Sequence, residues 1–198
     1  MLTMEPPLIG PRVLVRPFRA TDLDDVSVFQ SDPLVLPFIP WQLRTPEETR
    51  EWLERVSGSA VREEGDHGAW AVERKQDGRV IGSVNLSWVS RLHGQAEFGF
   101  VLATDAQGSG YATEATSVML DAAFPTLDLH RAYARVDARN EASLRMLRRW
   151  GMRQEAYLRG REFFKGEWTD IVIFAVLRQE WAARRPPAAS PTGVPPYG

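Results

Sequence analysis

The segment TDAQGSGYATEA, residues 104–115, carries the clearest chemical signal in the chain. A β-like run precedes it and an amphipathic run follows, so Gly108, Ser109 and Gly110 lie where a strand turns into a helix. Glycine backbone at a helix N-terminus directs several N–H groups toward one point, an arrangement that binds phosphate groups. A Walker A loop needs a lysine after Gly110, and a dinucleotide fingerprint needs a glycine where Thr113 stands. The segment therefore predicts an anion site of another kind.

Composition excludes several kinds of chemistry. The chain has 198 residues, no cysteine and a formal net charge of −2. Without cysteine there is no disulfide, thiolate metal site or cysteine acyl intermediate, and the near-neutral charge argues against non-specific nucleic-acid binding.

His67, His93 and His130 have no ligand-like spacing, so we predict no metal site. No apolar run approaches about 18 residues, and Glu5 lies among prolines near the start, so we expect no membrane span, no signal peptide and a cytoplasmic location.

The surrounding sequence predicts the elements that must position this loop. Alternating apolar residues predict strands at 12–18, on both sides of Asp77-Gly78 within 68–89, and at 94–103, 131–137, 153–164 and 168–178. Helices are predicted over 22–30, with Thr21 and Asp24 as a capping box; over 48–61, after Thr45, Pro46 and Glu48; over 111–124, ended by Pro125; and from Asn140 to Gly151. This order predicts one domain over residues 1–183, and the proline-rich residues 184–198 are expected to form a disordered or extended tail.

Two motifs on these elements carry a family resemblance. Gln107-x-x-Gly110-x-Ala112, between a strand and a helix, resembles the acyl-CoA pyrophosphate motif of the GNAT acetyltransferases. About 28 residues on, RNEASLRMLRRWGM (139–152) resembles the second signature of the ribosomal-protein N-terminal acetyltransferase branch, an N-x-x-S helix start followed by a glycine-ended helix. AEFGF, GYATEA and the RPF opening fit the same branch. The resemblance extends over residues 10–180.

The resemblance implies an α/β (α+β) fold with a mixed, mostly antiparallel sheet of about seven strands and helices on both faces. The sheet would be splayed between its fourth strand, 95–103, and its fifth, 131–137, and acetyl-CoA would enter the splay as co-substrate, without a metal. The implied cofactor-binding residues are Phe100, Val101 and Leu102 for pantetheine, Gln107, Gly108, Ser109, Gly110, Tyr111 and Ala112 for the pyrophosphate, and Asn140 and Ser143 for the pantetheine arm and its sulfur. As alternatives, the glycines form an ordinary turn and Asn140 is a plain N-cap, although an N-cap can bind pantetheine at the same time.

Three side chains are implied in the chemistry. Ser143 matches a serine thought to protonate the departing thiolate. Glu162 falls where this branch carries a glutamate that takes the amine proton through water, and Glu97 lies where other GNAT enzymes place their base; Glu162 is the preferred of the two. As alternatives, Ser143 is an ordinary first-turn serine, Glu162 is a solvated charge between Arg161 and Lys165, and Glu97 only holds a hydrogen bond in the sheet.

The implied reaction is direct attack of a neutral primary amine on the acetyl thioester in a ternary complex. An α-amino group is about 10% neutral at pH 7 and a lysine amine below about 0.1%, so a protein N-terminal α-amine, of ribosomal-protein type, is the leading acceptor. A small amine such as an aminoglycoside, polyamine or amino-acid derivative is the alternative substrate, and a noncatalytic acyl-CoA sensor is the alternative class. We expect a monomer or homodimer with no nucleic-acid or membrane partner.

The acceptor cleft is expected between residues 32–45 and 157–168. The stretch 32–41 holds three prolines among large apolar residues, which favours a loop that lines a wall or groove. Trp41 is expected beside this cleft, and Trp70, Trp150 and Trp168 are expected in the core.

Overall fold

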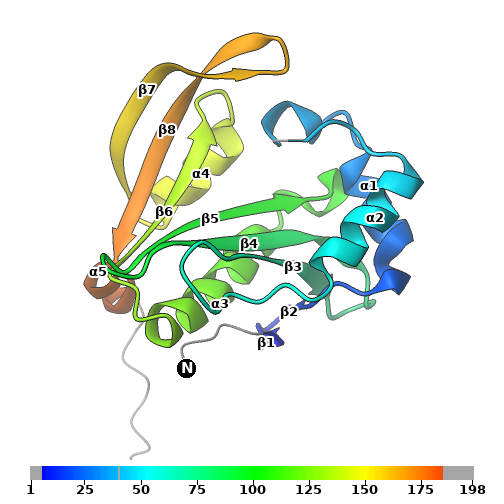
Figure 1. Ribbon diagram of the computed structural model, residues 1–198, viewed down its shortest axis with the longest axis horizontal. Helices are drawn as coiled ribbons and strands as arrows, with labels where there is room; N and C mark the ends of the chain where they lie inside the picture. The colour runs from blue at the N-terminus through cyan, green and yellow to red at the C-terminus, as the bar shows by residue number, and fades with distance from the viewer. Residues whose placement is uncertain (1–5, 40, 185–198) are drawn as a thin grey trace, which may run out of the picture.

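An eight-stranded sheet forms the centre of the computed structural model, which describes residues 6–39 and 41–184. The strand order is β1-β2-β3-β4-β5-β6-β8-β7, and within the described residues β5–β6 is the single parallel pair (Figure 1). The strands are β1 (Leu8–Ile9), β2 (Val13–Arg16), β3 (His67–Arg74), β4 (Val80–Ser90), β5 (Gln95–Leu102), β6 (Arg131–Asp137), β7 (Arg153–Phe164) and β8 (Glu167–Leu177). The helices are α1 (Leu23–Gln30), α2 (Pro46–Val56), α3 (Tyr111–Thr126), α4 (Glu141–Arg149) and α5 (Arg178–Ala183), with 3₁₀ turns at Ala20–Asp22, Leu36–Phe38 and Thr104–Ala106.

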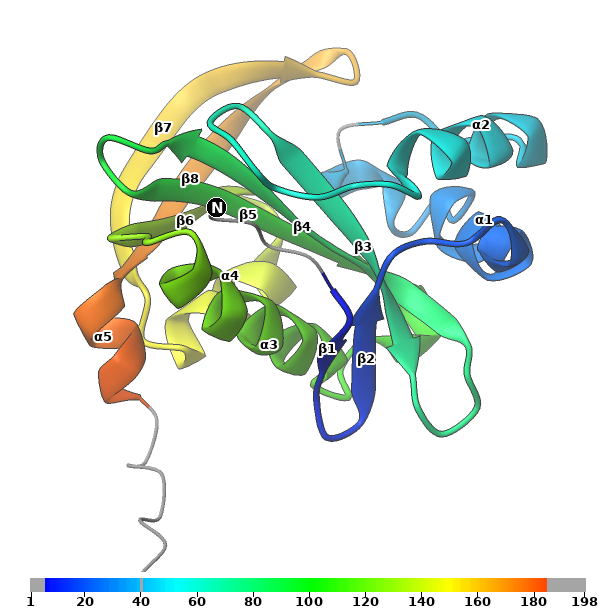
Figure 2. The ribbon, with the colours of Figure 1, turned by 60° about the horizontal axis from the view of Figure 1, so that its bottom comes forward.

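Helices cover both faces of the sheet and divide the core in two. Alternation along β5 sends Phe98 and Leu102 into a large cluster with residues of α3 and α4, whereas Val101 joins a smaller cluster with α1 and α2. In Figure 2, α3 lies across one face of the sheet near β1 and β2, while α1 and α2 lie together at the other end of the molecule. Odd-numbered residues of β5 therefore point toward the α1/α2 side, and so does Glu97.

The predicted splay is confirmed, at the predicted place. Only Gln95, Ala96 and Glu97 of β5 pair with β6, and Glu97 is opposite Tyr133. Beyond this point β5 stays bonded to β4 and β6 to β8, while their facing edges separate (Figure 1). In the described chain, those edges therefore present backbone N–H and C=O groups that no strand satisfies. The short strand β1 was not predicted and brings the number of strands to eight. The strands predicted as fourth and fifth are therefore β5 and β6.

Three element boundaries differ from the sequence expectation. Thr21 does not cap α1, because a 3₁₀ turn precedes the helix and Asp22 occupies the cap position; its carboxylate instead accepts two hydrogen bonds from buried Arg16. Helix α2 begins as expected, with Thr45 and Glu48 forming a capping box, but ends at Val56 instead of running to 61. Pro125 does not end α3, which continues to Thr126. Of the predicted tail, residues 185–198 lie outside the described residues.

Candidate functional site

Both motif segments meet at one edge of the sheet. Because β5 and β6 are parallel, their carboxyl ends, Leu102 and Asp137, lie at the same edge. The helices that follow, α3 and α4, begin there, and the first turn of each leaves N–H groups without intrahelical partners. The splay thus opens between two helix N-termini, which is a favourable place for an anionic ligand.

The 107–112 loop has the backbone that its glycines suggested. Gly108 and Gly110 have φ angles of 74° and 82°, in the left-handed region that favours glycine, and Gly110 is the N-cap of α3. Gln107 uses its side chain inside the fold, since its Nε2 donates to the Leu102 carbonyl over 3.1 Å. Ser109 is exposed. A 3₁₀ turn, Thr104–Ala106, joins β5 to this loop, and residues 107–110 are exposed. The side-chain amide of Gln107 is bonded to the end of β5.

An ion pair that sequence reasoning missed fixes the start of α3. The Glu114 carboxylate accepts hydrogen bonds from the Arg12 and Val13 backbone N–H groups, at 2.5 and 3.0 Å, and from Arg12 Nε at 2.7 Å. Burial would raise the pKa of Glu114, but these donors and the Arg12 charge lower it overall. The first turn of α3 is thereby held against the start of β2. Glu114 is visible in the sequence only as a first-turn acid.

Asn140 caps α4, and Ser143 lies in its first turn. Asn140 Oδ1 accepts the Ser143 backbone N–H over 3.1 Å, so the N-cap interpretation of Asn140 is confirmed. This bond uses the carbonyl of the Asn140 amide and the backbone of Ser143. The Asn140 NH₂ group and the half-buried Ser143 side chain are therefore not needed for the cap, and both lie at the edge where the splay opens.

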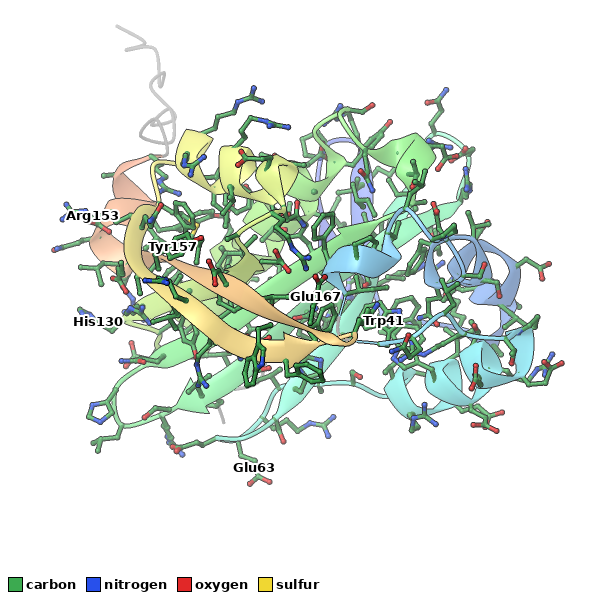
Figure 3. The ribbon with its side chains drawn as sticks, turned by 90° about the horizontal axis from the view of Figure 1, so that it is seen from above. Trp41, Glu63, His130, Arg153, Tyr157 and Glu167 are labelled. Atoms are coloured by element: carbon green, nitrogen blue, oxygen red, sulfur yellow. The ribbon has the colours of Figure 1, made fainter. Side chains whose placement is uncertain are left out.

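A pocket of about 260 Å³ opens on the α1/α2 side of the splay. Its walls come from the 3₁₀ turn after α1 and from β5, β6, β7 and β8: Phe38, Glu97, Arg135, Asp137, Glu162, Phe164, Thr169 and Ile171. Residues far apart in sequence meet here, as expected for the acceptor cleft between 32–45 and 157–168. In Figure 3, Glu167 at the tip of the β7–β8 hairpin lies close to Trp41 in the view. Trp41 itself does not line the pocket and instead stacks on Arg44.

Glu97 lies in a row of polar side chains that crosses four strands. Strand register places His67, Ser87, Glu97 and Tyr133 side by side. The Tyr133 hydroxyl donates to Glu97, and the pKa of Tyr133 is raised by burial and by the charge of this carboxylate. His67 Nδ1 and Ser87 Oγ are 2.8 Å apart, and burial lowers the pKa of His67 despite the opposing effect of Glu97. The carboxylate is therefore oriented by a neutral donor.

Glu162 has a different environment. A bulge between Leu158 and Glu162 shifts the register of β7 against β8 and places Glu162 opposite Thr169. Asp170 fixes the bulge by accepting the Gly160 N–H over 2.7 Å. The Glu162 carboxylate forms an ion pair with Arg135 of β6, a partner the sequence did not indicate. Both candidate bases therefore line one pocket, but Glu162 is bound to a cation.

The β7–β8 hairpin also exposes aromatic rings. Trp168, expected in the core, is 68% exposed, because it lies near the hairpin tip where β7 is the edge strand. Its ring centroid is 5.5 Å from that of Phe163, which is 65% exposed. Trp70 is buried as expected, and Trp150 is half-buried against Phe98.

Over residues 6–39 and 41–184, no three histidine or acidic side chains gather as metal ligands, and no helix is long and apolar enough to cross a bilayer.

Comparison with known proteins agrees with this geometry. Residues 12–153 match the acetyltransferase (GNAT) domain family. The uncharacterized N-acetyltransferase p20 of Bacillus licheniformis is 27% identical over 172 residues, which cover 86% of this chain and 96% of that protein. Spermidine N(1)-acetyltransferase of Escherichia coli K12 is 29% identical over 107 residues, 54% of this chain and 58% of that one.

The same architecture is found among solved structures. A GNAT-family acetyltransferase from Bacillus anthracis superimposes with a TM-score of 0.77 and 26% identity, covering 87% of this chain and 98% of that structure. The family match spans well over half of the sequence and includes the loop, the splay and the start of α4. The chain therefore belongs to the GNAT acetyltransferases, the family of acetyl-CoA-dependent N-acyltransferases.

Proposed function

We propose that this acetyltransferase acts on the α-amine of a peptide or protein N-terminus, which enters the 260 Å³ pocket and meets acetyl-CoA at the splay. The observation that carries this proposal is the place of Glu97, the last residue of β5 that pairs with β6. Its side chain lines the acceptor pocket, and the splay begins at the next residue. A carboxylate at that junction is suited to receive a proton from an amine that attacks a thioester held between the strands.

The residues present fit the acetyl-CoA chemistry. Beyond Glu97 the backbone of β5 has no β6 partner, so Phe100, Val101 and Leu102 line the open edge that a pantetheine arm would bind like an added strand, although the Leu102 carbonyl is already bonded to Gln107. The exposed backbone of residues 108–112 suits a pyrophosphate at the α3 N-terminus. Acetyl-CoA supplies the acyl group as a thioester, and the chain supplies the positioning, an oxyanion donor from the strand backbone and the proton transfers.

Ion pairing favours Glu97 over Glu162 as the base, which reverses the preference drawn from the sequence. The Arg135 guanidinium occupies the Glu162 carboxylate as an ion-pair partner, so this carboxylate is less free to contact an incoming amine. Glu97 is instead bonded to the neutral hydroxyl of Tyr133. We therefore assign Glu97 as the base and Glu162 as part of the acceptor pocket.

The charge balance of the pocket suits an acceptor with one cationic group. Arg135 pairs with Glu162, and Arg139 pairs with Asp137 at 2.7 Å. A polyamine brings several positive charges and would need several uncompensated carboxylates. A peptide N-terminus brings one amine and an extended backbone, which can contact the aromatic rings of Phe38 and Phe164 in the pocket wall. The α-amine also needs less help from a base.

Spermidine is the second candidate acceptor, favoured by the similarity to the E. coli spermidine enzyme. A panel distinguishes the two: a short peptide with a free α-amine, the same peptide N-terminally blocked but with one lysine, spermidine, and an aminoglycoside. We expect thiol release from acetyl-CoA with the free peptide and at most about one hundredth of that rate with the blocked one, as the lower pKa of the α-amine dictates. Faster turnover of spermidine than of the free peptide would refute the α-amine assignment. No release with any amine, despite tight acetyl-CoA binding, would favour a sensor.

Replacing Ser143 with alanine tests the general acid. Because Asn140 bonds the backbone of residue 143, the cap should survive. We expect kcat to fall about 10²-fold with little change in KM for acetyl-CoA, since the hydroxyl acts only on the leaving sulfur. The deficit should shrink above about pH 8.5, where a thiolate leaves without protonation. An unchanged kcat would return Ser143 to the role of an ordinary helix serine.

A further inference from the structure

The pyrophosphate loop has no basic side chain of its own. Residues 104–115 contain no lysine or arginine, and they contain two acids, Asp105 and Glu114. The Glu114 side chain is only 12% exposed and lies in the first turn of α3. An uncompensated carboxylate there would cancel part of the positive potential at the helix N-terminus and repel a phosphate group. The positive charge must therefore come from another part of the fold.

Antiparallel pairing brings that charge from the N-terminal strands. Because β2 to β5 alternate in direction, the start of β2 and the start of β4 lie at the edge where β5 ends. Arg79, before β4, pairs with Asp105 at 2.5 Å. Arg12, before β2, pairs with Glu114 at 2.7 Å. Each acid of the loop region is thus matched by an arginine from a different strand.

Arg12 is the arginine that lies against the loop itself. Its Nη1 donates to the Ser109 carbonyl over 3.0 Å, and its guanidinium carbon lies 4.8 Å from the centroid of the Tyr111 ring. Its Nη2 lies 3.4 Å from the place where a Cβ on Gly110 would be. The Arg12 side chain is 52% exposed. A guanidinium has five N–H donors; the bonds to Glu114 and Ser109 use Nε and Nη1, and Nη2 lies beside Gly110 at the helix N-terminus.

We propose that Arg12 is an acetyl-CoA-binding residue, whose guanidinium supplies the positive charge for the pyrophosphate that the loop sequence lacks. This inference rests on the proposed binding of the pyrophosphate at residues 107–112. Arg12 acts through its charge: it neutralises Glu114 and presents Nη2 to the anion. When the Arg12 side chain is replaced, the Glu114 carboxylate can still accept hydrogen bonds from the backbone N–H groups of residue 12 and Val13. The contact between α3 and the start of β2 can therefore survive the substitution.

The test compares Arg12→Gln with Arg12→Lys by calorimetric titration with acetyl-CoA, and with CoA, in the absence of acceptor. Loss of a charge-assisted contact should weaken binding by Arg12→Gln roughly tenfold or more and flatten the salt dependence of Kd. Arg12→Lys keeps the charge without the guanidinium fork and should bind within about threefold of wild type. Arg91→Gln, which removes an exposed arginine just beyond the opposite end of β4, is the matched control and should leave Kd unchanged.

Wild-type affinity for acetyl-CoA in Arg12→Gln would overturn the proposal. Equal losses of affinity in Arg12→Gln and Arg12→Lys would also overturn it, because they would show that the guanidinium matters for its hydrogen bonds within the protein and not for its charge. Thermal unfolding of each apo variant verifies that the fold is retained. Substitution of Ser109 tests the loop assignment separately. If a charge at Ser109 weakens binding and Arg12→Gln does not, the loop assignment stands and only the Arg12 inference fails.

Discussion

Replacing Glu97 with glutamine is expected to lower kcat by roughly 10²-fold or more at pH 7, because the attacking amine loses the group that takes its proton. Glutamine keeps the size of the side chain and can still accept the Tyr133 hydroxyl bond, so the row of polar side chains should persist. KM for acetyl-CoA should hardly change. The rate deficit should shrink as pH rises through about 8, where the α-amine is neutral without help.

Glu162→Gln is the matched control in the same pocket. The substitution removes a carboxylate already paired with Arg135, and kcat should fall by less than about tenfold if Glu97 is the base. Thiol-release kinetics from pH 6.5 to 9 with the preferred acceptor measure both variants. A larger loss in Glu162→Gln, with a near-normal Glu97→Gln enzyme, would restore Glu162 as the base and leave Glu97 as a sheet hydrogen-bond partner.

Replacing Ser109 with glutamate should weaken acetyl-CoA binding by about 10- to 100-fold, since a carboxylate within several ångströms of a phosphate repels it by a few kcal/mol at an intermediate dielectric constant. Ser109 is exposed and lies between the two left-handed glycines, so the new side chain has room and should not disturb the core. The expected readout is loss of most of the thermal stabilisation that acetyl-CoA gives the wild type.

Ser109→Gln separates charge from size. The glutamine variant should retain acetyl-CoA stabilisation to within a few degrees of wild type, and raising the salt concentration should narrow the gap between the two variants. Equal affinity in the glutamate and glutamine variants would place the pyrophosphate away from residues 107–112. The proposed path of the cofactor through the splay would then have to be abandoned.

The predicted fold and loop rest on patterns that are contiguous in the chain. The turn at Gly108–Gly110, the capping box at Thr45 and Glu48, and the Asn140 cap each depend on residues within a few positions of one another, which a sequence displays directly. The predicted Thr21 cap is wrong because Thr21 lies inside a 3₁₀ turn, Ala20–Asp22, and the helix begins only after Asp22, whose carboxylate accepts hydrogen bonds from buried Arg16.

The sequence by itself determined the donor side of this protein: a strand, a glycine loop and a capped helix that together imply an acyl-CoA. Only the tertiary structure decided how the charges are arranged. Arg12 and Glu114 are 102 positions apart and meet through strand pairing, while Arg135 reaches Glu162 across β8 because a bulge shifts β7. Glu97 meets Tyr133 only because β5 and β6 run parallel for three residues before they separate. Such pairings depend on register between distant strands, and local side-chain periodicity fixes which face a residue occupies without fixing which residue stands opposite.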